Sequence, residues 1–260
     1  MIQHQFVNNA IEALRNDPSV IGLAVAGSWL TNEIDEFSDV DLVLVTKEKI
    51  SNDRSKMMAY AQRLGKFLSG FTGEHVGEPR VLICLYDDPL LHVDIKFVTL
   101  EEFWQRIETP VILLDTQGQL QAVLDASEAT SPYPDYQWIE DRFWTWIHYA
   151  LLKIGRGEYM EAFDFFGALR MMVLGPLVHT RNGNLPRGVR KVEAQLPAAE
   201  LELLKSTLPQ YSKESFLKSL ENAVALYRGL RKDLFPPEIQ LHPEVEEKVM
   251  EYFDAIRQRS

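Results

Sequence analysis

Apolar positions along the first half of the chain follow two different spacings. The runs 20–27 and 41–45 are short, continuous and rich in β-branched residues, which favours buried strands. Segments 5–16 and 53–71 instead place their apolar residues at helical intervals. The pattern therefore predicts a helix, two strands separated by a turn, and a second helix, in that order.

Segment 80–98 is predicted to form a hairpin of two strands. The Asp-Asp-Pro sequence at 87–89 separates two apolar runs, and these residues form turns that leave room for only a short link. In the second strand His92, Asp94 and Lys96 alternate with apolar residues. Because side chains alternate across a strand, one face of this strand is polar and the other apolar.

A domain boundary is predicted where Ser, Thr and Pro concentrate, at 127–137. A short helix at 100–107 and a strand at 111–115 close the first half, and every long segment after the boundary has helical periodicity. We therefore expect an α/β (α+β) protein. A mixed sheet with flanking helices, 1–130, is followed by a helical bundle, 131–260.

Composition narrows the class of protein without naming an activity. The 260 residues are 46% hydrophobic and 25% charged, as in ordinary globular enzymes. Lys and Arg total 27 and Asp and Glu total 38, so the formal charge is −11 at pH 7 and the chain repels polyanions such as nucleic acids. Without a leader pattern or a membrane-length apolar run, we expect a cytoplasmic protein with no membrane partner. Cys84 is the single cysteine, which excludes an intrachain disulfide and a thiolate metal cluster, and we interpret it as a small buried hydrophobe.

Gly27 and Ser28 end the first apolar run, where a helix is expected to begin. A helix N-terminus offers unpaired N–H groups and a positive dipole end, which suits a phosphate. Gly27 permits close approach because it has no Cβ, and the Ser28 hydroxyl can donate a hydrogen bond. Taken alone, the pair is better explained as a turn followed by an N-cap.

Three carboxylates are predicted to share one face of the sheet. Asp39 and Asp41 stand one residue apart where the run 41–45 begins, and side chains two apart on a strand leave the same face. Asp94 lies on the polar face of the later hairpin strand, which an antiparallel or mixed sheet can place beside Asp41. Such carboxylates repel one another unless a divalent cation neutralises them. An all-oxygen ligand set favours Mg²⁺ over Zn²⁺, and a pair of ions about 3.5–4 Å apart is typical of phosphoryl-transfer sites.

These residues together resemble the signature of the DNA polymerase beta-like nucleotidyltransferase superfamily. Gly27-Ser28 is followed after ten residues by Asp39-Val-Asp41-Leu, and Asp94 comes on a later strand. The fused helical half is similar to that of aminoglycoside and lincosamide nucleotidyltransferases, with LLKIGRGEY as the stretch that carries the likeness.

The resemblance implies a role for each of these residues. Gly27 and Ser28 would hold the nucleotide phosphates, and Asp39 and Asp41 would bind the metal ions. Asp94 would complete one metal site and help to deprotonate the acceptor hydroxyl. Lys96, on the same face, can pair with Asp94 and lower its basicity, so whether Asp94 is a base or only a ligand stays open.

Cationic residues of the second half are weaker candidates for nucleotide contacts. Lys153 lies near a predicted helix end, where cations are favoured by the dipole alone. Arg187 and Arg190 belong to the one basic cluster of an acidic chain, which is explained equally well as a solvated loop. His179, on an apolar segment, is interpreted as a core residue. Trp138, on the first long helix of this half, is interpreted as a core or interface residue, with base stacking as the alternative.

The sequence as a whole predicts a Mg²⁺-dependent transferase. The resemblance implies transfer of a nucleoside monophosphate, AMP from ATP, to a hydroxyl of a small, cationic, aminoglycoside-like acceptor. The acceptor is expected in a cleft between the two halves, with acidic residues of the 29–38 loop at its rim. Two alternatives are a regulatory or antitoxin-like interaction protein and a protein or RNA nucleotidylyltransferase, the RNA case being disfavoured by the charge of −11. The oligomeric state is left open.

Overall fold

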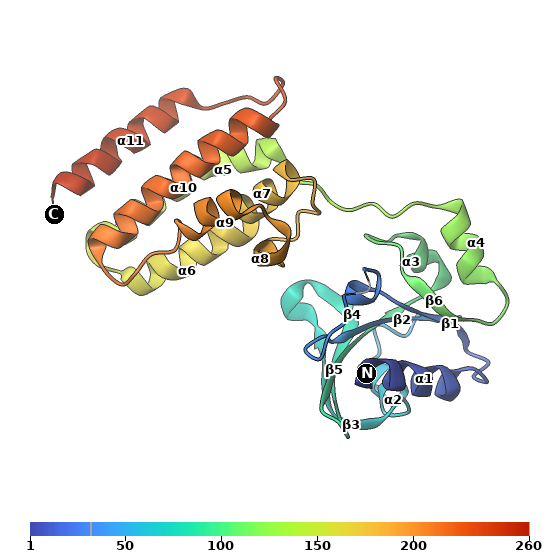
Figure 1. Ribbon diagram of the computed structural model, residues 1–260. Coiled ribbons are helices and arrows are strands. Elements are labelled where there is room, and N and C mark those ends of the chain that lie inside the picture. The colour runs from blue at the N-terminus through green and yellow to red at the C-terminus, as the bar shows by residue number, and fades with distance from the viewer. Residues whose placement is uncertain (32, 260) are drawn as a thin grey trace. The chain divides into compact units, whose positions relative to one another are not determined.

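The computed structural model describes residues 1–31 and 33–259 and divides into two compact units, Met1–Ser131 and Pro132–Ser260 (Figure 1). The first unit contains the sheet, and the second contains helices α5 to α11.

The first unit is built on a six-stranded mixed sheet with the strand order β3-β4-β5-β2-β1-β6. Strands β2 and β5 are parallel, whereas the other neighbouring pairs are antiparallel. The strands are β1 (Val20–Val25), β2 (Val40–Thr46), β3 (Lys66–Gly73), β4 (Glu78–Asp87), β5 (Leu91–Val98) and β6 (Val111–Asp115). The predicted fold class, a mixed sheet with flanking helices followed by a helical half, is confirmed.

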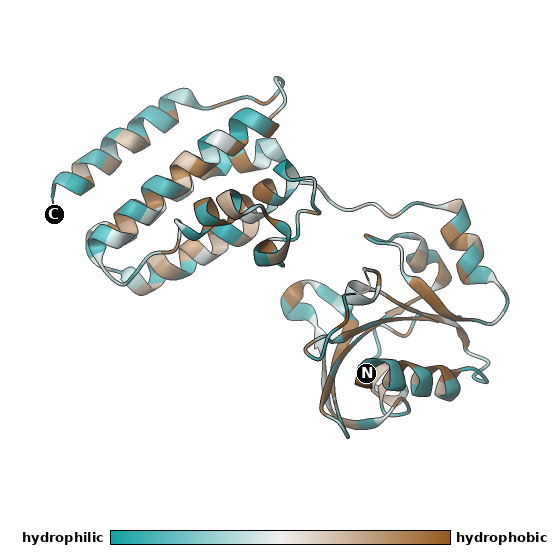
Figure 2. Cartoon of the chain, in the orientation of Figure 1, coloured by the Kyte–Doolittle hydropathy of each residue, from teal (hydrophilic) through white to brown (hydrophobic). Residues whose placement is uncertain are grey.

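Helices cover both faces of this sheet. Helices α1 (Ile2–Leu14) and α2 (Arg54–Ala61) pack on one face, and α3 (Leu100–Trp104) and α4 (Gln119–Ala126) pack on the other (Figure 1). All six residues of β1 are buried, because a strand with both faces covered needs a continuous apolar run. Figure 2 shows that the strands are coloured mostly as hydrophobic, whereas the helices carry many hydrophilic residues.

The predicted hairpin at 80–98 is confirmed. Strands β4 and β5 are antiparallel, and Tyr86 pairs with Leu91 across the turn. Cys84 on β4 is buried, as expected of a small hydrophobe, and burial raises the pKa of its thiol to about 12.

The prediction of one helix over 53–71 is wrong in its second part. Helix α2 begins after Asp53, whose side chain accepts a hydrogen bond from the Lys56 N–H at 3.1 Å, and it ends at Ala61. Residues 66–73 form the edge strand β3, in which Phe67 pairs with Tyr86 of β4. A short apolar run fits either period, and here pairing with the neighbouring strand decides the outcome.

The second unit is a set of helices around an aromatic core. Its elements are α5 (Tyr136–Arg156), α6 (Tyr159–Leu169), the π-helical turn η3 (Arg170–Leu174), α7 (Gly175–Arg181), α8 (Val192–Gln195), α9 (Ala198–Lys205), α10 (Lys213–Leu234) and α11 (Pro243–Gln258). The largest buried side chains are Phe143, Trp144, Phe166, Phe216, Tyr227 and Phe253.

One helical stretch of the described chain is long and apolar enough to cross a membrane by length and composition. It runs from Tyr159 to Arg181. Its apolar 18-residue segment has a mean hydropathy of 1.2, and 56% of that segment is buried inside the protein. No run of this length was expected from the sequence, because polar residues interrupt the stretch. A core helix of a soluble protein meets the same criterion, so the stretch is weak evidence for a membrane span.

Candidate functional site

Asp41 and Asp94 are brought together by the parallel pairing of β2 and β5. They are direct partners in the register of these strands, and adjacent strands lie about 4.8 Å apart. Their neighbours Leu42 and Ile95 are buried in the core under α1 and α2, so both carboxylates leave the opposite face. Asp39 directly precedes β2 and is partly buried. The shared face expected for Asp41 and Asp94 is therefore present.

The turn at Gly27 lies directly against the Asp41 carboxylate. Gly27 has a φ of +64°, and a Cβ built on it would stand 1.9 Å from Asp41 Oδ2. The Ala26 N–H donates to the backbone oxygen of Asp41 at 2.9 Å, which ties the turn to β2. Only glycine combines this backbone conformation with so close an approach.

The helix expected to begin at Gly27 is replaced by a shorter element. Gly27–Trp29 form a single 3₁₀ turn, η1, and the described residues after it form turns and irregular chain as far as β2. The segment 30–38 is rich in turn-forming and acidic residues and lacks a helical repeat of apolar positions. Without a helix there is no macrodipole, so a phosphate here would depend on individual N–H groups and the Ser28 hydroxyl.

Glu108 is a residue of this site that the sequence pattern did not indicate. The Gly27 N–H donates to Glu108 Oε1 at 3.1 Å. Glu108 lies in the loop between α3 and β6, 81 positions from Gly27, so no local sequence pattern links the two residues. Gly27 is thus flanked by two carboxylates, Asp41 against its Cα and Glu108 at its N–H.

The other polar residues of β5 form two separate contacts. His92 Nε2 lies 2.9 Å from Asp94 Oδ1. Lys96 Nζ lies 2.9 Å from Glu78 Oε2 on β4. Arg80 also binds Glu78, and these two cations lower the pKa of the Glu78 carboxyl to about 2. The suggested pairing of Lys96 with Asp94 is therefore corrected: Lys96 pairs with Glu78, and histidine contacts Asp94.

The carboxylates at this site have the chemistry that a Mg²⁺ ion requires, although they do not form a complete ligand set by themselves. Among the described residues, no group of three or more His, Cys, Asp or Glu side chains is placed to hold a metal ion. Mg²⁺ is commonly bound by one or two carboxylates together with substrate phosphates and water. The register pair Asp41 and Asp94, with Asp39 next to it in the chain, fits that mode of binding.

Lys153 is engaged by carboxylates of its own unit. Its Nζ lies 2.9 Å from both Glu158 and Glu161, and these partners raise the pKa of the Lys153 ammonium. Tyr149 donates a hydrogen bond to Glu161 in the same cluster. The positive charge of Lys153 is therefore balanced locally, at the C-terminal turn of α5.

Arg187 and Arg190 are exposed in the segment between α7 and α8. The backbone oxygen of Arg190 lies 3.0 Å from Nε2 of His179, which is fully buried. Burial lowers the pKa of the His179 imidazole. The interpretation of His179 as a core residue is confirmed, and it fixes the backbone beside the basic cluster.

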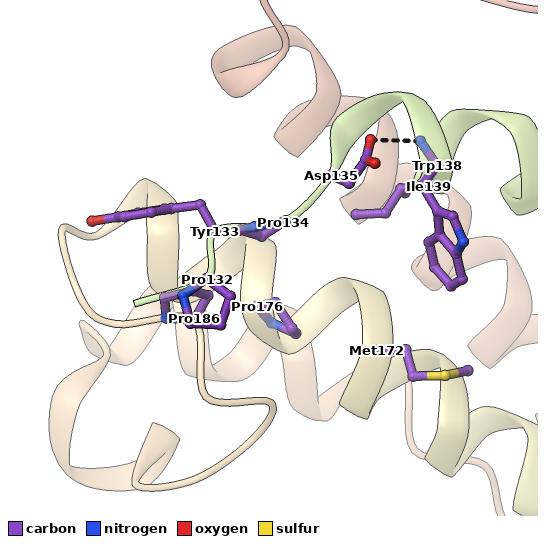
Figure 3. A pocket seen from close by; sticks show the side chains of 9 residues that line it. All are labelled: Pro132, Tyr133, Pro134, Asp135, Trp138, Ile139, Met172, Pro176 and Pro186. Carbon is purple, nitrogen blue, oxygen red and sulfur yellow. Dashed lines mark hydrogen bonds between the residues drawn. The ribbon is translucent and has the colours of Figure 1, made fainter. Parts of the chain in front are cut away.

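A pocket of about 220 Å³ lies at the start of the helical unit (Figure 3). Its lining includes Tyr133, Trp138, Met172 and several prolines. Trp138 is 38% exposed, and the Arg142 guanidinium lies over its ring at 4.4 Å. Trp138 is therefore a surface residue of this unit, whereas Trp144 on the same helix is buried in its core.

Comparison with solved structures finds distant likenesses. No family model matches the chain, and no curated protein matches it. A crystal structure of an aminoglycoside 6-adenyltransferase from Bacillus subtilis is 18% identical, with 96% of this chain and 97% of that chain covered and a TM-score of 0.42. A TM-score this low does not establish a common fold.

Proposed function

We propose that the protein is a Mg²⁺-dependent nucleotidyltransferase that moves AMP from ATP to a hydroxyl of a small, cationic molecule. The observation that supports this most directly is the register pair Asp41 and Asp94 with the Gly27 turn packed on Asp41. Carboxylates beside a turn that carries backbone N–H and hydroxyl donors suit a metal-bound triphosphate.

Each residue of the proposed site has a distinct task. The Gly27 N–H and the Ser28 hydroxyl would donate to phosphate oxygens. Asp39, Asp41 and Asp94 would hold the metal. When bound, Mg²⁺ would supply positive charge that offsets the charge of the phosphates and of the leaving pyrophosphate.

Transfer requires an acceptor oxygen, a base and a leaving group. The acceptor hydroxyl oxygen attacks the α-phosphorus, the bond from that phosphorus to the pyrophosphate oxygen breaks, and pyrophosphate leaves. Asp94 takes the hydroxyl proton on a carboxylate oxygen. The contact of His92 with Oδ1 holds the Asp94 carboxylate in one orientation. Because Lys96 pairs with Glu78, it does not lower the basicity of Asp94 through an ion pair.

Charge supports a cationic acceptor. The chain carries −11 overall, and the 29–38 loop before β2 holds the exposed acids Asp35 and Glu36. A negative local field attracts cations and repels nucleic acid. We further propose that Lys153, Arg187 and Arg190 of the helical unit contact the nucleotide and that the protein is cytoplasmic.

Mass spectrometry of candidate acceptors tests the function. The full chain is incubated with ATP and Mg²⁺ and a panel of amino-sugars, lincosamides and neutral polyols, and released pyrophosphate is measured in parallel. We expect one acceptor class to gain the mass of an adenylyl group, with one pyrophosphate released for each transfer. The Asp41→Asn variant is the control for contaminating activity. Absence of adenylated product and of pyrophosphate with every acceptor and each common nucleoside triphosphate would contradict the proposal.

A further inference from the structure

We propose that Glu108 and a bound nucleotide phosphate compete for the same backbone N–H, that of Gly27. This inference rests on the proposed function and concerns how tightly the same site binds the phosphates of its nucleotide. Glu108 then sets the affinity of the site for phosphates, a role that neither the motif nor the resemblance assigns to it.

The first support is the contact itself. The Gly27 N–H donates to Glu108 Oε1 at 3.1 Å, which is a charge-assisted hydrogen bond to a carboxylate. Because Gly27–Trp29 form only one 3₁₀ turn, the phosphate-binding capacity of this segment lies in a few individual donors. One of those donors, the Gly27 N–H, is already bonded to the Glu108 carboxylate. A phosphate oxygen would accept the same hydrogen bond, so the two anions exclude each other at this donor.

The second support is that the chain holds Glu108 in this place. Arg106, two residues earlier, donates to Ser127 Oγ at 2.6 Å, and its backbone oxygen accepts the Thr130 N–H at 2.9 Å. The Ser131 hydroxyl donates to the backbone oxygen of Ile107 at 2.9 Å. The loop that carries Glu108 is therefore fixed on the segment 127–131, and the carboxylate is presented to the turn by a tethered backbone.

The third support is electrostatic. Gly27 already has the Asp41 carboxylate against its Cα, so Glu108 adds a second negative charge at the same glycine. A phosphate that reached the Gly27 N–H would have to displace Glu108 and would be repelled by its charge if it stayed close. Removal of the charge should therefore strengthen phosphate binding, the opposite of what a supporting residue would do.

Calorimetric titration of the full chain tests the competition. The probes are inorganic triphosphate and a non-hydrolysable ATP analogue, each with Mg²⁺. Glu108→Ala removes the carboxylate, and Glu108→Gln keeps an acceptor oxygen for the N–H without the charge. Glu101→Ala is the matched control, because Glu101 is an exposed acid on the preceding helix α3. Melting temperatures of all variants report whether the fold is retained.

We expect Glu108→Ala to lower the Kd of both probes about tenfold, as loss of one charge-assisted hydrogen bond predicts. Glu108→Gln should give a smaller decrease, and Glu101→Ala should leave the Kd within about twofold of wild type. Unchanged binding in both Glu108 variants would contradict the proposed competition. Weaker binding in both would also contradict it and would indicate that Glu108 supports the turn. If neither the wild type nor any variant bound either probe, the proposed function would fail and this inference with it. If Glu108→Ala fails to fold, the Glu108→Gln result decides.

Discussion

Asp41 and Asp94 face each other at one level of the parallel strands β2 and β5, and both side chains leave the sheet face opposite α1 and α2. Two carboxylates one strand spacing apart repel each other, which is unfavourable for the isolated fold. The neighbours Leu42 and Ile95 are buried in the core, and this burial stabilises the strand pair against the repulsion. Such an arrangement is typical of a site where function, and not stability, determines the residue type.

Asp41→Asn is expected to reduce nucleotidyl transfer at least about a hundredfold while the fold stays intact. The change removes one proposed metal ligand and also one of two facing negative charges. The melting temperature without metal should therefore stay level or rise. Steady-state transfer assays and thermal melts, each with and without Mg²⁺, measure both effects.

Asp254→Asn is the matched control, because Asp254 is an exposed carboxylate on α11 of the other unit. It should change neither activity nor melting temperature. Near-full turnover of Asp41→Asn with Mg²⁺ would end the catalytic role assigned to Asp41.

Gly27→Ala is expected to abolish nucleotidyl transfer, because the added Cβ displaces the Asp41 carboxylate. A Cβ at this position would stand 1.9 Å from Asp41 Oδ2, so the carboxylate must rotate away. Gly118→Ala provides a matched comparison, because Gly118 has a similar φ of +69° but no atom within 4 Å of the added Cβ. Both variants should lose about 1–2 kcal/mol of stability from the left-handed backbone. Only Gly27→Ala should lose activity, and equal activity of the two variants would show that Gly27 is merely a turn.

The parts of the fold that could be predicted are those where a local pattern and the final packing agree. The run at 41–45 and the alternation around Asp94 indicated two strands with a shared polar face, because burial of one strand face leaves a period of two in the sequence. The strands of Asp41 and Asp94 are parallel neighbours because of long-range pairing. The sequence did not decide this pairing, since it was compatible with an antiparallel or a mixed sheet.

The features that could not be predicted depend on contacts between distant residues. Strand β3 looked helical because its short apolar run fits both periods, and only its pairing with β4 decides the structure. Glu108 reaches Gly27 across 81 positions through a loop tied down by Arg106. The partner of Lys96 could not be predicted because Glu78 lies on the neighbouring strand, whereas Asp94 is close in sequence.

Glu140→Ala is expected to destabilise the helical unit by about 3–5 kcal/mol. The Glu140 side chain is fully buried. It accepts hydrogen bonds from Trp144 and Tyr227 and forms an ion pair with Arg231. Removal of the carboxylate leaves the buried Trp144 and Tyr227 donors without this acceptor and leaves Arg231 with its other partner, Glu246. Chemical denaturation of the full chain measures the loss. Tyr227→Phe removes one donor only, so it should cost about 1 kcal/mol, and a Glu140→Ala loss no larger than this would contradict the interpretation.

Glu78 should make the sheet unit more stable at neutral than at acid pH. Arg80, together with Lys96, lowers the pKa of the folded carboxyl from 4.5 to about 2. A depressed pKa contributes stability that is present above the unfolded value and is lost as pH falls toward the folded value. Wild type should therefore exceed Glu78→Gln by about 1–2 kcal/mol at pH 7, and the difference should shrink between about pH 4.5 and pH 2.

Chemical denaturation at pH 7, 4 and 3 measures this difference. The control is Glu48→Gln, which changes an exposed acid and should show no comparable dependence on pH. A difference between wild type and Glu78→Gln that stayed constant over this range would show that the ion pairs with Arg80 and Lys96 do not act on folding.

Capture of a cationic acceptor should weaken as salt rises. The chain carries −11, and electrostatic attraction is screened over about 8 Å at physiological ionic strength. The KM for amino-sugar acceptors should therefore increase with ionic strength, with little change in kcat, whereas the KM for neutral polyols should stay constant. Glu36→Gln, a change to an exposed acid of the loop before β2, should raise the KM for cationic acceptors and reduce its salt dependence. If only neutral acceptors react and salt leaves their KM unchanged, the electrostatic argument is wrong even where nucleotidyl transfer itself is observed.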